Sequence, residues 1–266
     1  MGQTELQGTV TPAYVFDIDK LRATMRRLRA AVDGRAKICY AVKANPFLAE
    51  DLTEEADAFE VCSPGEYDIC ESLHIPAEKI VLSGVYKAEQ GVRRAVRRCG
   101  VRAVYTAESP SQLSLLSRLA EEEGLRLPVL LRLSSGNQFG MDGQTILEFL
   151  QRGKELPLSV VGIQYYSGTQ KRAEAMKKEM QLLCEFATRA KELAPSIDRI
   201  EYGPGLRVDY FVGEDTEENA LKVLSEILQY VPPFLHTVLE IGRFIAAECG
   251  DYYTRVVDLK HTDGAA

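Results

Sequence analysis

The chain has 266 residues, of which 45% are hydrophobic and 27% are charged, values typical of a globular protein with one large domain or two small ones. Its formal net charge of −7 argues against a nucleic-acid partner. It contains no run of about 18 consecutive apolar residues and no apolar segment near its start, so we expect a cytoplasmic protein with no membrane partner.

The first predicted elements are a short strand and a helix within residues 11–32. The helix is expected to be capped near Asp17 or Asp19, because a carboxylate accepts hydrogen bonds from the free N–H groups of a helix start. Residues 1–34 are therefore treated as an N-terminal strand and helix.

From residue 36 to residue 240, short apolar runs alternate with longer amphipathic segments. The short runs are typical of strands, and apolar residues spaced by three and four in the longer segments are typical of helices. Eight strands are predicted, at residues 37–42, 58–62, 79–83, 102–106, 127–133, 159–166, 198–202 and 236–240. The helical patterns include residues 64–73, 88–99, 109–124 and 171–194.

Strands separated by helices favour parallel pairing, because a parallel connection must cross back over the sheet. Eight such units predict a closed (β/α)8 barrel over residues 35–247, with a doubly wound open sheet as the alternative. A further strand is predicted at 253–259, where Val256, Val257 and Leu259 lie.

Cysteines, histidines and the main basic cluster point to structural roles. The six cysteines form no CxxC pair and the three histidines are isolated, so we predict free thiols and no metal site. Four arginines within residues 93–98 span about one helical turn and favour a solvated helix face over a phosphate-binding patch.

The end of the first barrel strand carries Lys43. In a barrel of this kind the chemistry lies on loops after the carboxyl ends of the strands. A lysine there is an ordinary surface residue if it faces solvent. If it points into the barrel mouth, desolvation lowers the pKa of its amine, which becomes a nucleophile toward carbonyls. We expect such a lowered pKa.

Two glycine-containing loops follow the last two predicted strands. One carries Gly203 and Gly205, and the other carries Gly242 and Arg243 beside Glu240. Each alone fits an ordinary turn or a local ion pair. Together they fit a phosphate site, because glycines expose backbone N–H groups and arginine adds a planar cation. A reactive lysine, a phosphate site and a carboxylate are what pyridoxal 5'-phosphate requires.

With these loops the sequence resembles the fold-type III pyridoxal-phosphate-dependent decarboxylases, the group of diaminopimelate, ornithine and arginine decarboxylases related in barrel to alanine racemase. The matching motifs are YAVKAN (40–45), FEVCSPGE (59–66), EYGPGL (201–206) and EIGR (240–243), and the resemblance covers roughly residues 11 to 260. It implies that Lys43 forms an aldimine with the cofactor and that Glu240 pairs with the pyridine nitrogen. It also implies a phosphate site made by Gly203, Gly205, Gly242 and Arg243.

Several positions complete or alter the family pattern. Tyr166 stands where the family has a histidine stacked on the cofactor ring, Thr169 replaces a serine near the phosphate, and Ile241 replaces a proline. A tyrosine can stack on a ring, but it lacks the proton chemistry of histidine near neutral pH. Arg132, at the end of the fifth barrel strand, is also a cofactor-binding candidate.

A larger departure from the family concerns the carboxy-terminal β-domain. Residues 248–266 are expected to be only the start of that domain, the rest being truncated or separately encoded. The strands at 13–16 and 253–259 would then lack the sheet they normally join and leave exposed edges. We expect a homodimer or a complex with a separate β-domain subunit, and poor activity of this chain alone.

The leading functional prediction is a pyridoxal-phosphate-dependent decarboxylase that acts on an amino acid or on an aminoacyl group bound to a carrier protein. The acid that protonates the carbanion is unassigned, because in the family it belongs to the β-domain. The alternatives are an amino acid racemase, with Tyr166 as one of two bases, and a non-catalytic barrel scaffold.

Overall fold

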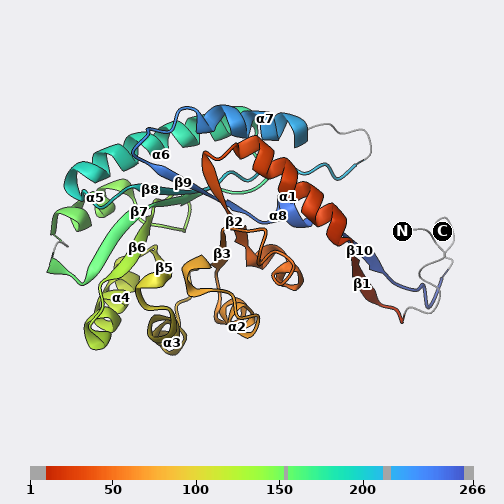
Figure 1. Cartoon of the computed structure of the whole chain (residues 1–266), viewed down its shortest axis with the longest axis horizontal. Helices are drawn as coiled ribbons and strands as arrows, with labels where there is room; N and C mark the ends of the chain where they lie inside the picture. Colours follow the sequence, from red (N-terminus) through yellow and green to blue (C-terminus); the bar gives the residue numbers. More distant parts are fainter. Residues whose placement is uncertain (1–9, 153–154, 212–216, 261–266) are drawn as a thin grey trace.

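Eight parallel strands close into a barrel in the computed structural model, which describes residues 10–152, 155–211 and 217–260 (Figure 1). Strand β9 pairs in parallel with β2, from Ala36 opposite Thr237 to Tyr40 opposite Ile241, and this pairing closes the sheet. The predicted (β/α)8 barrel is therefore confirmed, and the open doubly wound sheet is wrong.

Each barrel strand lies within two residues of its predicted bounds. The strands are β2 (Ala36–Ala41), β3 (Ala58–Val61), β4 (Ile80–Leu82), β5 (Val104–Ala107), β6 (Leu127–Arg132), β7 (Leu158–Tyr166), β8 (Arg199–Gly203) and β9 (His236–Ile241). The helices are α1 (Ile18–Val32), α2 (Pro64–Ser72), α3 (Glu89–Cys99), α4 (Pro110–Glu123), α5 (Gly143–Arg152), α6 (Ala173–Leu193), α7 (Glu217–Leu228) and α8 (Arg243–Ala246).

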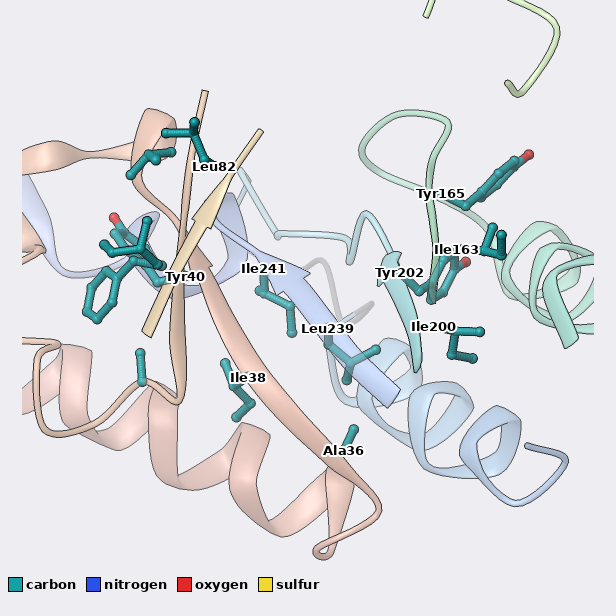
Figure 2. Close-up of a cluster of buried hydrophobic side chains, with 14 of the residues drawn as sticks. Ala36, Ile38, Tyr40, Leu82, Ile163, Tyr165, Ile200, Tyr202, Leu239 and Ile241 are labelled. Carbon is teal, nitrogen blue, oxygen red and sulfur yellow. The ribbon is translucent and has the colours of Figure 1, made fainter. Parts of the chain in front are cut away.

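The alternation of side chains along the strands separates two apolar clusters. Ile38 and Tyr40 of β2 belong to the large cluster that packs the strands against the helices, part of which Figure 2 shows. Cys39, between them, belongs to a smaller cluster inside the barrel, with Ala58, Val81, Leu130 and Val238. Because side chains repeat every second residue on a strand, Glu60 and Glu240 face the barrel interior near its carboxyl end.

A separate two-stranded sheet brings the ends of the described chain together. Strands β1 (Ala13–Phe16) and β10 (Gly250–Tyr253) pair in antiparallel fashion, and Figure 1 shows them beside the barrel, near both termini. Asp17 caps α1, since its carboxylate accepts a hydrogen bond from the N–H of Lys20 at 3.1 Å. The strand and the capped helix predicted for residues 11–32 are thus present, and the division at residues 34 and 247 stays a prediction.

The strand predicted at 253–259 is wrong in its position. Residues 254–260 form no regular secondary structure, and the side chains of Val256 and Val257 are 80% and 90% exposed. β1 begins at Ala13, which lies opposite Tyr253, and the residue before it is Pro12, which has no N–H to donate to a strand beyond Tyr253. The two strands expected to lack a sheet instead pair with each other.

The remaining structural expectations concern thiols, arginines and helices. All six cysteines are free and five of them are buried.

The arginines of α3 form exposed ion pairs with acids of neighbouring helices, such as Arg98 with Glu71 at 2.8 Å and Arg97 with Glu123 at 2.7 Å, so the solvated helix face is confirmed. Among the helices that the structure describes, none is both long and apolar enough to cross a membrane.

Candidate active site at the carboxyl end of the barrel

A cavity of about 510 Å³ opens at the carboxyl ends of β2 and β7 to β9. This volume lies within the roughly 300–1,000 Å³ of typical small-molecule sites. Seven of the nine residues predicted to bind the cofactor line it: Lys43, Tyr166, Thr169, Gly205, Glu240, Gly242 and Arg243. The barrel therefore brings together residues that are up to 200 positions apart in the sequence.

Lys43 lies in a short 3-10 turn that directly follows β2. Its side chain is 44% exposed toward the cavity, and its Nζ forms an ion pair with the Glu60 carboxylate of β3. Nζ also donates to the Cys62 Sγ at 3.4 Å and lies 5.9 Å from the centre of the Tyr166 ring. The amine is thus within the cavity, between an acidic wall and an aromatic wall.

The predicted lowering of the Lys43 pKa is wrong for the chain without its cofactor. Burial alone would lower this pKa, but the negative charge of Glu60, which pairs with Nζ, outweighs it, so the pKa of Lys43 is raised. A desolvated lysine gains reactivity only where no carboxylate neutralises it. The amine is therefore protonated at neutral pH and must lose a proton before it can attack a carbonyl.

Glu60 is a site residue that the sequence interpretation missed. It is 4% exposed in β3, and its Oε1 accepts a hydrogen bond from the Cys62 thiol at 3.2 Å while its other oxygen pairs with Lys43. The available signal was an acid within AFEVC, a strand buried on both faces. A carboxylate in that position requires a partner.

Glu240 lies buried at the end of β9, and its two carboxyl oxygens differ in their hydrogen bonding. Its Oε2 accepts a hydrogen bond from the Gln164 amide at 2.9 Å, whereas its Oε1 is buried without a hydrogen-bond partner among the described residues. Burial raises the pKa of Glu240, and the negative charges of Glu60 and Glu201 raise it further. Glu240 lines the cavity, and a carboxyl group in this wall fits the pyridine nitrogen of the predicted cofactor.

The glycine loops leave room where side chains would fill the cavity wall. A Cβ on Gly242 would lie 2.7 Å from the Cβ of Ala44. Gly205 has φ +58, in the left-handed region that favours glycine, and a Cβ there would collide with the carbonyl of Gly168. Arg243, whose Nη1 donates to the Tyr210 hydroxyl at 3.0 Å, lines the same cavity. This set fits a phosphate group.

Gly203 and Arg132 do not line the cavity. A Cβ on Gly203 would collide with the ring of Tyr166, so this glycine permits close packing of that ring. The Arg132 guanidinium forms an ion pair with Glu108 at 2.9 Å and lies 5.0 Å from the centre of the Phe139 ring. A direct cofactor contact by either residue has no support from their placement and stays a prediction.

Tyr165 and Tyr166 point to opposite sides of β7. Tyr165 is 7% exposed and belongs to the cluster between strands and helices, whereas Tyr166 lines the cavity. Burial raises the pKa of Tyr166, and the positive charge of Lys43 offsets this only in part. Its phenol therefore keeps its proton near neutral pH, which makes it a poor base.

Comparison with known proteins agrees with this geometry. Residues 18–247 match the family model described as the pyridoxal-binding domain of pyridoxal-dependent decarboxylases. Diaminopimelate decarboxylase of Vibrio cholerae is 30% identical over 282 aligned residues, which cover 95% of this chain and 65% of that enzyme. The L-glutamyl-[BtrI acyl-carrier protein] decarboxylase of Niallia circulans is 27% identical, with 96% and 65% covered.

Solved structures show the same architecture. The AQ1208 protein of Aquifex aeolicus aligns with a TM-score of 0.84 and 27% identity over 98% of this chain and 65% of that one. Diaminopimelate decarboxylase of Helicobacter pylori aligns with a TM-score of 0.82 at 24% identity, over 93% and 67%. The chain spans about 65% of the length of the curated relatives it matches.

The predicted family and its cofactor, pyridoxal phosphate, are thereby confirmed at the level of the domain. The motifs around Lys43, Glu60, Gly205 and Glu240 lie within the matched residues, and each of the four contributes residues to the cavity lining. The chain belongs to the pyridoxal-dependent decarboxylases and contains their pyridoxal-binding domain.

Proposed function

We propose that this chain is the cofactor-binding barrel of a decarboxylase that acts on an amino acid or on an aminoacyl group held by a carrier. The supporting observation is the shared cavity, where the Lys43 amine, the Glu240 carboxyl and the loops of Gly205 and Gly242 meet. The names of the relatives support both substrate classes, since they include diaminopimelate decarboxylases and a carrier-bound glutamyl decarboxylase.

The cofactor would be held at three points of the cavity. Lys43 would bind its aldehyde carbon, Glu240 its ring nitrogen, and Gly205, Gly242 and Arg243 its phosphate. When bound, pyridoxal phosphate supplies an electron sink for the bond that breaks at the substrate carboxylate.

The residues around the cofactor control protons. Glu60 contacts Lys43 and can accept the proton that the amine must lose before it reacts. Gln164 donates to one oxygen of Glu240 and so holds this carboxyl in the cavity wall, where it could hydrogen-bond a ring nitrogen. Tyr166 presents its ring beside Lys43, with the ring centre 5.9 Å from Nζ.

The alternative functions have less support. A racemase needs a base on each face of the cofactor, and the raised pKa of Tyr166 argues against that residue as one of them. A cofactor-free scaffold has no need for a buried acid such as Glu240 in a cavity wall, because burying a carboxyl group costs free energy.

We further propose that the active assembly includes a β-domain and a second copy of the barrel, and that it is cytoplasmic. The relatives are longer than this chain, and exposed apolar side chains lie on and after the β1 and β10 sheet, including Tyr14, Tyr252 and Val257. Light scattering of the purified chain with and without an added β-domain tests the assembly, and cell fractionation tests the location.

The decisive experiment adds pyridoxal phosphate to the purified chain, reduces it with borohydride and maps the modified lysine by mass spectrometry. Lys87 provides an internal control, because burial lowers the pKa of this other lysine to about 8. Simple amine reactivity would modify Lys87, whereas a built cofactor site would modify Lys43 despite its raised pKa. Release of carbon dioxide from diaminopimelate and from carrier-bound glutamate then tests the reaction.

A further inference from the structure

A buried polar cluster lies behind the cavity, between α6 and the loop that follows β7. Glu179 of α6 accepts hydrogen bonds from the Lys171 ammonium at 2.7 Å, from the Tyr202 hydroxyl at 2.7 Å and from the Ser167 hydroxyl. The side chains of Lys171 and Glu179 are only 6% and 14% exposed. Neither residue lines the cavity, and the proton chemistry described above does not use them.

Lys171 contacts the glycine loop after β8 through its backbone and its side chain. Its Nζ donates to the carbonyl of Gly203 at 2.9 Å, and its backbone N–H donates to the carbonyl of Gly205 at 3.0 Å. A Cβ on Gly205 would lie 3.0 Å from the Lys171 Cε, so the side chain packs directly against the loop. One lysine therefore holds both glycines around Pro204.

The same ammonium lies close to the aromatic wall of the cavity. Its Nζ is 5.6 Å from the centre of the Tyr166 ring and 5.0 Å from that of Tyr202. These distances are within the range of cation–π contacts. The cluster thus contacts the loop and the ring that we assign to the phosphate and to the cofactor ring.

The pair is more than a means of attaching α6 to the barrel. That helix already buries Met176, Met180 and Leu183 in the apolar core. A buried ion pair is seldom the most stabilising choice for a core position, because both charges must be desolvated. What the pair adds is directional hydrogen bonds to the Gly203 carbonyl and the Tyr202 hydroxyl.

We propose that Lys171 and Glu179 are positioning residues, which hold the 203–205 loop and the Tyr166 ring in the arrangement that binds pyridoxal phosphate. This inference rests on the proposed function, because it assigns the loop and the ring to that cofactor. The two residues act through Gly203, Gly205, Tyr166 and Tyr202 and do not touch the cofactor themselves.

Three variants of the full chain test this role. Lys171→Met and Glu179→Gln each remove one partner, and the double variant removes both charges together. Lys177→Met is the matched control, since Lys177 lies on the same helix and pairs with Glu226 at 3.0 Å in an exposed position, with side chains 50% and 39% exposed.

The first measurement is hydrogen–deuterium exchange of the cofactor-free chain. We expect the single variants to raise exchange across residues 203–208 by about tenfold, the size of one lost hydrogen bond to a charged group. Residues 236–241 of β9 and the control variant should show no change. This readout is independent of pyridoxal phosphate, so it reports on the pair even if the proposed function fails.

The second measurement is pyridoxal phosphate binding, with the visible circular dichroism of the saturated protein. We expect the dissociation constant to rise about tenfold in each single variant and the dichroic band, which reports ring orientation, to change even at saturation. The double variant should regain thermal stability because no unpaired charge is left buried. Its binding should stay weak, since the Gly203 carbonyl still lacks the Lys171 ammonium as its donor.

Each alternative result is decisive. If binding recovers together with stability in the double variant, or if the single variants match Lys177→Met, the pair is merely structural and the proposal is overturned. If the wild-type chain forms no adduct at Lys43, the proposed function fails and the positioning role falls with it. The exchange data would then still show whether the pair clamps the loop.

Discussion

The two halves of the barrel mouth both carry a lysine and buried carboxylates, yet they differ in what those groups contact. On the cavity side, Lys43 pairs with Glu60, and the pKa of its amine is raised. On the β4 to β6 side, Lys87 donates to the carbonyl of Gly84 at 2.8 Å, and burial lowers the pKa of its amine to about 8. Burial alone therefore does not decide how a strand-end lysine behaves; the nearest carboxylate does.

The halves also differ in how many of their buried polar groups have hydrogen-bond or ion-pair partners. Glu108 and Arg132 pair at 2.9 Å, and Ser83 donates to Thr106 at 3.0 Å on the β4 to β6 side. On the other side, the buried Oε1 of Glu240 has no hydrogen-bond partner among the described residues. The other described buried side-chain atoms without a partner also lie on or after β7 to β9, the side of the mouth that carries the cavity.

The largest effect is expected when Lys43 itself is removed. Lys43→Ala should abolish the borohydride-stable adduct and lower decarboxylation by about a thousandfold or more, because the covalent anchor is lost. Lys87→Ala should leave the adduct intact. Mass mapping after reduction checks both variants, and an adduct that persists without Lys43 would contradict the distinction between the two halves.

A large effect is also expected from filling the phosphate loop. Gly242→Ala places a Cβ 2.7 Å from that of Ala44, so the loop must move and pyridoxal phosphate affinity should fall about tenfold or more. Gly65→Ala is the matched control, since a Cβ there meets nothing within 4 Å. Absorbance titration measures both, and equal affinities would show that the loop is not the phosphate site.

Glu60→Gln should move the pH dependence of adduct formation. Glu60 raises the pKa of Lys43, so the variant should lower that pKa, and the midpoint should shift to lower pH by about one unit or more. The control Glu108→Gln removes the corresponding acid near Lys87 and should leave this midpoint unchanged. The initial rate of adduct formation between pH 6 and 10 is the measurement, and an unshifted midpoint would exclude Glu60 as the proton acceptor.

Glu240→Gln should stabilise the cofactor-free chain while weakening cofactor binding. Burial raises the pKa of Glu240 in the folded chain, so the unfolded state releases this proton at lower pH and the free energy of unfolding falls as the pH rises through that range. Glu240→Gln has no proton to lose at this position, so its free energy of unfolding does not fall in this way. At pH 8 it should exceed the wild-type value by roughly 1 kcal/mol, which raises the melting temperature by about 2–4 °C.

Thermal melts from pH 4 to pH 8 check this expectation, with exposed Glu78→Gln as the control. The melting curves of wild type and Glu240→Gln should converge toward pH 4, where the acid is protonated in both states. A constant difference at every pH would mean that packing, and not the proton, separates them.

The smallest effect on cofactor binding is expected from Arg132→Met. The substitution leaves Glu108 buried without its partner, so the melting temperature should fall markedly. Pyridoxal phosphate affinity, measured well below that temperature, should change by less than about threefold, because the guanidinium lies outside the cavity lining. A large loss of affinity would restore Arg132 to the cofactor site.

The sequence by itself determined the eight strands and the loops that follow them. The reason is that the spacing of apolar residues, in short runs for strands and at every third or fourth position for helices, is a local property of the chain. The barrel rule then placed Lys43, Glu240 and Gly242 at one end, since the carboxyl ends of parallel strands share one rim. The family motifs stand at the same loops, so most of the cofactor cavity was predictable from residue order alone.

Only the tertiary structure decided what each charged group contacts. Lys43 meets Glu60 across two neighbouring strands, and Gln164 reaches Glu240 over 76 residues of sequence, so neither pKa direction could be obtained from local spacing. The ion pair of Arg132 with Glu108, 24 residues away in the sequence, could not be obtained from local spacing either. The last strand ended at Tyr253 because pairing depends on the partner strand, and Pro12, the residue before β1, has no N–H to donate. Electrostatics and strand pairing are properties of contacts between distant segments, which the fold alone creates.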